Sequence, residues 1–248
     1  MEREKNLINN EFYHDLDETW YEGHNHPITL LRAENRIRNP WIAQEIAHHF
    51  HKRVTVLDIG CGGGLLTGYL MTKGHEVSGI DLSEKSLEVA RRKDLEGKIH
   101  YQKADASQLP FDDESFEVVA AMDLLEHVAD YQAVIREGAR VLKKGGLFFF
   151  HTFNRTLFSY LVVIKGVEWV VPNAPKNMHV YPLFIKPNEL KTCLEINRCK
   201  VQKIQGLSLE VRSKAFFRLL FKRELQDDIA FKFSPSLKGG YVGIAQKL

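Results

Sequence analysis

The sequence predicts a single α/β domain with a doubly wound, mostly parallel sheet of seven strands, N-terminal helices and an insertion after the fifth strand. First, short apolar runs alternate with helical patterns, which favours parallel strands joined by right-handed crossovers. Second, a glycine-rich turn joins the first run to the first helix. Third, 248 residues with 44% hydrophobic content suffice for one substantial core.

The elements follow in order along the chain. Residues 1–50 are predicted to be a helical segment that covers a ligand, and 51–248 to be the main domain. The predicted strands are 54–60, 75–81, 98–105, 116–123, 147–153, 199–211 and 239–248. The predicted helices between them are 64–74, 83–94 with Ser83 as N-cap, 131–146 ending at Gly145 and Gly146, and 187–197. Residues 154–186 and 210–238 are predicted to be insertions that contact substrate or membrane.

Composition excludes several classes of protein. A net charge of +2 without a concentrated basic stripe argues against a nucleic-acid partner. The opening MEREKNLINNEF lacks the apolar stretch of a secretory signal. Cys61, Cys193 and Cys199 have neither disulfide-framework nor metal-ligand spacing, so we expect a reducing cytosol.

The stretch VLDIGCGGG (56–64) lies where the first strand meets the first helix, at the edge where such sheets bind ligands. Gly60 and Gly62 allow the backbone to approach a ligand closely. Leu65 stands where a dinucleotide fingerprint requires glycine, and Asp58 would repel a pyrophosphate but hold a cationic amino group. Asp81 ends the second strand, in position to accept ribose hydroxyls. We therefore expect a ligand with a ribose, an ammonium group and no phosphates.

Three more residues complete the predicted pocket. Asp105 follows the third strand, where it would meet an adenine amino group, with Ala106 alongside, and Met122 ends the fourth strand beside the same crevice. The alternatives are that Asp58 and Asp105 cap loops and that Met122 belongs to the core.

This combination resembles the class I S-adenosylmethionine-dependent methyltransferases over roughly residues 50–155. The resemblance implies that Gly60 and Gly62 hold the methionine part of S-adenosylmethionine, with Cys61 as a small residue of that loop rather than a nucleophile. It also implies that Asp81, followed by Leu82, binds the ribose and that Asp105 binds the adenine.

Two further stretches, TFNRT (152–156) and PKNMHVYPLFIKPNEL (175–190), resemble the ubiquinone-biosynthesis O-methyltransferases. This resemblance implies methylation of a phenolic hydroxyl on a polyprenylated catechol-type ring. Trp20 matches the first of the family's paired tryptophans, whereas Tyr21 replaces the second. Arg38 is the best match for the arginine that holds the cofactor carboxylate, although Asn39 and Pro40 follow it here instead of preceding it.

The stretch MDLLEHVAD (122–130) carries the predicted catalytic residues Asp123, Glu126 and His127. If it turns helically, the spacing i, i+3, i+4 puts all three on one face, as in a metal site. The family resemblance implies a divalent ion at this spacing. Oxygen ligands suit Mg²⁺, and the imidazole leaves Mn²⁺ or Zn²⁺ open. The alternatives are that His127 caps a helix or acts as general base without a metal.

The apolar run LFSYLVVIKGVEWVV (157–171) would reach roughly 22 Å as a helix, which is too short for a membrane core of about 30 Å. With the basic, apolar stretch KAFFRLLFKREL (214–225), it predicts peripheral contact with the cytoplasmic face of a membrane, where a prenylated substrate would be found. Partners in a biosynthetic complex would fit this location. Three alternatives remain: a buried helix, a lid on an enzyme for a soluble phenol, and a lipid-binding protein without catalysis.

Overall fold

The computed structural model describes residues 9–248, so the first eight residues of the predicted N-terminal segment lie outside the described part. The sheet has eight strands in the order β3-β2-β1-β4-β5-β8-β6-β7, and β1 to β5 are parallel to their neighbours within that group. The strands are β1 (Thr55–Ile59), β2 (Glu76–Asp81), β3 (His100–Lys103), β4 (Phe116–Met122), β5 (Leu142–Phe153), β6 (Cys199–Leu209), β7 (Phe231–Ser234) and β8 (Gly240–Lys247). The doubly wound fold predicted from the sequence is thus confirmed.

The predicted number of seven strands was one too few. Strand β7 pairs antiparallel with β6 at the edge of the sheet, within the stretch that the sequence analysis treated as an insertion. With four residues, it is too short for its alternation of Phe231, Lys232 and Phe233 to stand out.

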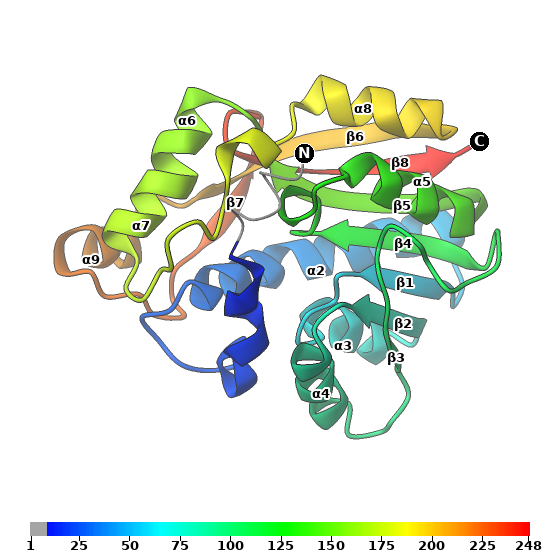
Figure 1. The fold of residues 1–248 in the computed structure, drawn as a ribbon, viewed down its shortest axis with the longest axis horizontal. Helices are drawn as coiled ribbons and strands as arrows, with labels where there is room; N and C mark the ends of the chain where they lie inside the picture. Colours follow the sequence, from blue (N-terminus) through cyan, green and yellow to red (C-terminus); the bar gives the residue numbers. More distant parts are fainter. Residues whose placement is uncertain (1–8) are drawn as a thin grey trace.

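Helices cover both faces of the sheet (Figure 1). One face packs against α2 (Ile28–Phe50), α3 (Leu65–Thr72) and α4 (Glu84–Lys93) through a core that includes Ile42, Leu70 and Leu87. The other face packs against α5 (Tyr131–Val141) and α8 (Pro187–Ile196). Both interiors are apolar, as a parallel sheet covered on two sides requires.

Two predicted helix ends can be compared directly. Ser83 caps α4 as predicted, because its hydroxyl accepts a hydrogen bond from the Ser86 amide. Helix α5 instead ends at Val141, and the two glycines lie inside the longer strand β5. Gly145 has φ +76°, and a Cβ on Gly146 would lie 2.7 Å from the Glu117 carbonyl oxygen, so the glycines permit an irregular close approach to β4.

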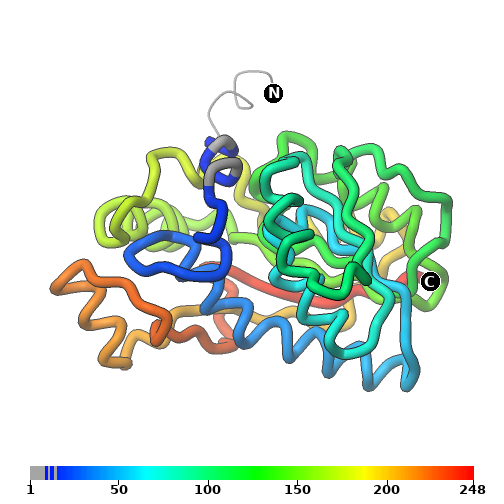
Figure 2. The backbone as a smooth tube through the Cα atoms, turned by 90° about the horizontal axis from the view of Figure 1, so that it is seen from below, coloured from blue at the N-terminus to red at the C-terminus, as the bar shows by residue number. Residues whose placement is uncertain are grey.

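At the carboxyl ends of β1, β4 and β5, three segments from distant parts of the chain gather (Figures 1 and 2). The N-terminal segment contributes the short helices η1 (Asn10–Asp15) and η2 (Asp17–Trp20). The apolar run forms one unbroken helix from α6 (Leu157–Ser159) through the π-helical η4 (Tyr160–Gly166) to α7 (Val167–Val170). Helix α9 (Lys214–Lys222) is the third, and η3 (Leu125–His127) and η5 (Tyr181–Leu183) lie in loops nearby.

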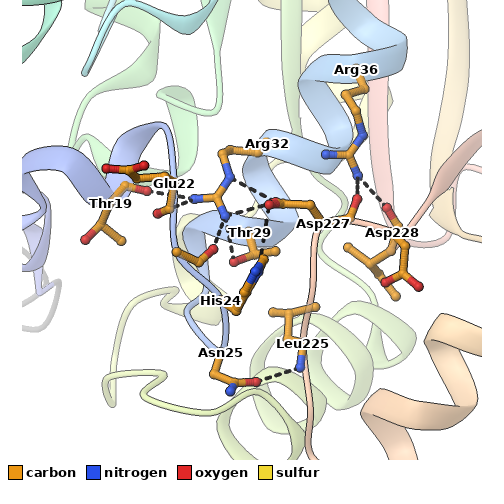
Figure 3. Close-up of polar contacts among 12 residues, drawn as sticks. Thr19, Glu22, His24, Asn25, Thr29, Arg32, Arg36, Leu225, Asp227 and Asp228 are labelled. Atoms are coloured by element: carbon orange, nitrogen blue, oxygen red, sulfur yellow. Dashed lines mark hydrogen bonds and ion pairs between the residues drawn. The ribbon is translucent and has the colours of Figure 1, made fainter.

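A polar clasp around Arg32 of α2 joins the first of these segments to the stretch that follows the third (Figure 3). The buried guanidinium donates to the carbonyl oxygens of Thr19, Glu22 and Gly23 and to the Asp227 carboxylate. Asn25 adds a reciprocal pair of hydrogen bonds with Leu225. The clasp therefore holds the N-terminal segment against the stretch that follows α9.

Candidate functional site

The glycine loop after β1 is bent as the sequence predicts. Gly60 and Gly62 have φ of +74° and +53°, a region that favours glycine. The amides of Gly60 and Cys61 donate to the Ile80 carbonyl oxygen at 2.8 and 2.9 Å, which fixes the loop to β2. A Cβ on Gly62 would lie 2.5 Å from the Trp20 ring, so η2 packs directly on the loop.

The acids at the ends of β1 and β2 lie beside this loop and border one cavity. The Asp81 carboxylate accepts hydrogen bonds from the amides of Gly62 and Ser83 at 2.9 and 2.8 Å. Asp58 is buried, and this burial together with the neighbouring Asp81 and Asp123 raises its pKa to about 7. A positively charged ligand beside Asp58 would favour its ionised form.

The other predicted cofactor residues also border the cavity, in different states. Ala106 and Met122 are buried, whereas Leu82 is exposed. Asp105 is exposed, and its Oδ1 accepts hydrogen bonds from the amide and hydroxyl of Ser107, so it caps its own loop, as the alternative interpretation held.

Cys61 fits the predicted role of a small loop residue. Its side chain is buried, and burial, with the negative charges of Asp58 and Asp81, raises the pKa of the thiol well above its usual value. A thiol held in this form is a poor nucleophile.

The cavity has a volume of about 790 Å³, within the usual range for small-molecule sites. One end is the glycine loop with Asp58 and Asp81. The other end lies between the α6–α7 helix, the end of β6, and α9, and it is mostly apolar, although Ser208, Lys232, Ser234 and Ser236 also line the cavity. Its lining there includes Phe158, Val162, Val167, Leu209 and Phe216.

Arg38, predicted to hold the cofactor carboxylate, is buried and borders the cavity. Its Nη1 and Nη2 atoms donate to both carboxylate oxygens of Asp123, at 2.7 and 2.5 Å, and it also pairs with Glu34 at 3.2 Å. Asp123 also contacts the buried His151 through Nδ1. Burial would raise the pKa of Asp123, but Arg38 and His151 hold it well below its usual range. Arg38 therefore anchors an internal ion-pair network, a partner set that the sequence analysis missed.

The predicted metal set of Asp123, Glu126 and His127 does not converge. Asp123 has a left-handed φ of +56° and precedes η3, so the expected helical face is not formed. Within residues 9–248, ligand-type atoms come within 4.8 Å of one another in two other sets: Glu34, Asp123, His151, and Glu126, His127, His179. The set predicted from spacing is not one of these two, because an i, i+3, i+4 pattern brings side chains together only on a regular helix.

The second of these sets is strongly perturbed by burial. Burial and the charge of Asp123 raise the pKa of Glu126 to about 7. Burial lowers the pKa of His127 to about 4, and burial with the adjacent His127 lowers that of His179 to about 3. Both imidazoles are therefore neutral at pH 7. His179 belongs to the stretch 175–190 that carried the family resemblance, and this was the only signal in the sequence that pointed to it.

Comparison with known proteins agrees with this geometry. A family model described as a methyltransferase domain matches residues 57–150. The magnesium protoporphyrin IX methyltransferase of Synechocystis PCC 6803, solved with bound SAH, shares the fold, with a TM-score of 0.68 and 18% identity over 100% of this chain and 99% of that one.

Curated relatives are more similar in sequence. A ubiquinone biosynthesis O-methyltransferase of Coxiella burnetii (strain RSA 331 / Henzerling II) is 37% identical over 199 residues, 79% of this chain and 82% of the relative. One from Bordetella avium (strain 197N) is 42% identical over 163 residues, 64% of this chain and 67% of the relative. The chain therefore belongs to the family of ubiquinone biosynthesis O-methyltransferases.

Proposed function

We propose that this enzyme transfers the methyl group of S-adenosylmethionine to a phenolic hydroxyl of a polyprenylated catechol-type intermediate in ubiquinone biosynthesis. The observation that carries the proposal is the shape of the cavity. It runs from the acid-flanked glycine loop to an apolar end between two exposed helices. A cationic nucleoside suits the first end, and a prenyl tail suits the second.

The cofactor residues act through charge and fit. The Asp81 carboxylate, held by the amides of Gly62 and Ser83, is in position to accept ribose hydroxyls. Asp58 would attract the ammonium group of the methionine part once ionised. Trp20 packs over the glycine loop and borders the cavity.

The phenol must lose its proton to attack the methyl group, and Glu126 and His127, both buried and both bordering the cavity, are the candidate acceptors. An ordinary phenol has a pKa of about 10. Burial lowers the pKa of His127 to about 4 and, with the charge of Asp123, raises that of Glu126 to about 7, so Glu126 is the stronger base of the two. Beyond this step the chain aligns the oxygen, methyl carbon and sulfur, and such positioning lowers barriers by about 7 to 11 kcal/mol.

The apolar helices fit peripheral contact with the cytoplasmic face of a membrane. Leu157, Leu161 and Trp169 of the α6–α7 helix are exposed, as are Phe217 and Phe221 of α9. The basic residues of α9 would lie near anionic headgroups. No helix in the described part of the chain is long and apolar enough to cross a membrane. Other enzymes of the same pathway are suitable partners at that surface.

The activity is tested by methyl transfer to catechols that differ only in the prenyl tail, each assayed with and without chelator. We expect the prenylated ring to react with the higher kcat/KM. Equal activity on a tail-less catechol would favour an enzyme for a soluble phenol, with residues 157–171 as a lid. Absence of S-adenosylmethionine binding in calorimetry would instead point to a lipid-binding protein without catalysis.

The membrane contact is tested by vesicle flotation with Leu157, Leu161 and Trp169 replaced by Ser. Ile164, which also belongs to the apolar run, is buried and would report on folding instead. Leu95→Ser is the matched control, because Leu95 is 93% exposed and lies after α4, away from both helices. Unchanged flotation of the triple variant would contradict membrane contact through this helix.

A further inference from the structure

The stretch TFNRT, which the cofactor site does not use, helps to join the start of the α6–α7 helix to the loop between β7 and β8. Four hydrogen bonds end on backbone carbonyl oxygens of that loop. They run from the Asn154 amide to Gly239, from the Asn154 side chain to Leu237, and from the hydroxyls of Thr156 and Ser159 to Lys238, at 2.6 to 2.9 Å. The loop and the start of the helix are therefore held in one fixed arrangement.

Two phenylalanine rings that border the cavity lie against the consecutive glycines at the start of β8. A Cβ on Gly240 would lie 3.3 Å from Cε1 of Phe153. A Cβ on Gly239 would lie 3.5 Å from Cε1 of Phe158. Apart from Phe158 and the chain neighbours of Gly239, no atom of the chain from residue 9 onward would come within 4 Å of this second Cβ. Both glycines border the cavity, so open space lies beside the Phe158 ring.

The passage formed by Phe153, Phe158, Gly239 and Gly240 lies between the two ends of the cavity. Phe153 contacts His179, with ring centroids 5.0 Å apart, and the His179 ring lies beside the candidate proton acceptors after β4. Phe158 instead belongs to the apolar lining. A substituent on a phenol ring held near the proton acceptors therefore reaches the apolar end by crossing the two glycines.

We propose, on the basis of the proposed function, that Gly239 and Phe158 determine which ring substituents the enzyme accepts. The first prenyl unit of the tail crosses Gly239, where the missing Cβ leaves room, and packs against the Phe158 ring. The rest of the tail lies in the apolar end of the cavity. The substrate class is thus a catechol with a slender apolar chain on its ring, and selection acts on the first unit of that chain rather than on its length.

The test compares kcat/KM for catechols with no tail, one prenyl unit or two. Gly239→Val fills the open space, so kcat/KM for the one-unit catechol should fall at least about tenfold, while that for the tail-less catechol stays within about twofold. The second unit should add no further loss, because it lies beyond the passage. Phe158→Ala removes the ring that packs on the first unit, so KM for the one-unit catechol should rise about fivefold or more with kcat unchanged.

Controls separate the passage from general effects of substitution. Gly239→Ala adds a methyl group at ordinary contact distance, and Gly68→Val lies in α3 outside the cavity lining, so both should retain the wild-type values. Ile196→Ala is the control for Phe158→Ala, because Ile196 is exposed at the end of α8 and lies outside this cavity. Circular dichroism and S-adenosylmethionine binding verify folding, and Phe158→Ala decides the outcome where Gly239→Val is not folded.

The outcomes distinguish this inference from the proposed function. A wild-type preference for the prenylated ring that survives both Gly239→Val and Phe158→Ala would overturn the inference and leave the proposed function standing. An equal loss on the tail-less catechol in Gly239→Val would also overturn it, because the ring itself would then lie over Gly239. Equal wild-type kcat/KM for tail-less and prenylated rings would refute the proposed substrate and the inference with it.

Discussion

The contact between Trp20 and the glycine loop makes Gly63→Ala a direct test of whether the N-terminal segment covers the cofactor. A Cβ on Gly63 would lie 2.4 Å from Trp20 Cγ and 2.8 Å from Trp20 Cβ. These atoms are at the root of the side chain, so rotation of the ring does not relieve the clash and η2 must move. Gly63 does not have the positive φ of Gly60 or Gly62, so the effect is steric and free of backbone strain.

Overpacking of this kind costs about 1 to 3 kcal/mol. If the whole cost destabilises the packing of η2 on the glycine loop, and cofactor binding requires that packing, the Kd for S-adenosylmethionine rises about 5- to 150-fold. Isothermal titration calorimetry measures it, with Gly68→Ala as the matched control. Gly68 lies in α3, and a Cβ added there would meet no atom of the described residues within 4 Å, so alanine should leave Kd unchanged. The same substitution should stabilise the fold by about 1 kcal/mol, because alanine favours a helix more than glycine does.

A double-mutant cycle with Trp20→Ala sharpens the test. Trp20→Ala removes the cover and the closest contact, at Cγ, and leaves only the 2.8 Å contact with Cβ, so most of the effect of Gly63→Ala should disappear in the Trp20→Ala background. An unchanged Kd in a folded Gly63→Ala protein would refute the reasoning, because it would show that η2 moves away from the loop without consequence for the cofactor.

Three further predictions concern a titrating acid, the clasp and the thiols. The pKa of Asp58 is about 7 in the fold, above its usual value, so its contribution to stability is full below pH 4 and falls as pH rises to 7. Binding of the cationic cofactor should strengthen about tenfold from pH 5 to 6, as Asp58 ionises, and level off above pH 7. Calorimetry of Asp58→Asn should show a flatter pH profile of cofactor binding. Arg32→Leu should lower the free energy of unfolding, measured in urea, by about 2 to 3 kcal/mol, since it removes hydrogen bonds to three carbonyl oxygens and to Asp227. A loss below about 0.5 kcal/mol would contradict a stabilising role of the clasp. Cys61, Cys193 and Cys199 are buried with raised pKa values, so a thiol reagent at pH 8 should react only after denaturation, and rapid labelling of the native protein would disprove this.

The sequence predicted those parts of the site that depend on strand ends. Asp58, Asp81 and the glycine loop follow buried apolar runs, and parallel strands bring their carboxyl ends to one edge whatever the details of packing. The helical layers follow from the same alternation. These features depend on local periodicity, which a single sequence carries.

The side-chain partners could not be predicted in the same way. Arg38 and Asp123 are 85 residues apart, and His151 and Asp123 are 28 apart, so their network depends on how α2 and β5 pack beside β4. Asp123 adopts a left-handed backbone conformation that no local pattern signals, so it does not share a helical face with Glu126 and His127 of η3. Residue spacing alone therefore could not show that a ring nitrogen of His179 lies within 4.8 Å of the ligand-type atoms of Glu126 and His127.

The clasp around Arg32 has a consequence for the order in which the protein assembles. Arg32 and Asp227 are separated by 195 residues, so bringing them together in the unfolded chain has a high entropic cost. That cost falls once most of the intervening chain has folded. The strands and their helices can pair through shorter loops, and the two ends meet last. A nascent chain would thus complete its sheet before it acquires a closed cofactor chamber. In a Trp41→Phe, Trp169→Phe variant, whose remaining tryptophan is Trp20, the recovery of fluorescence on refolding should lag behind the recovery of secondary structure.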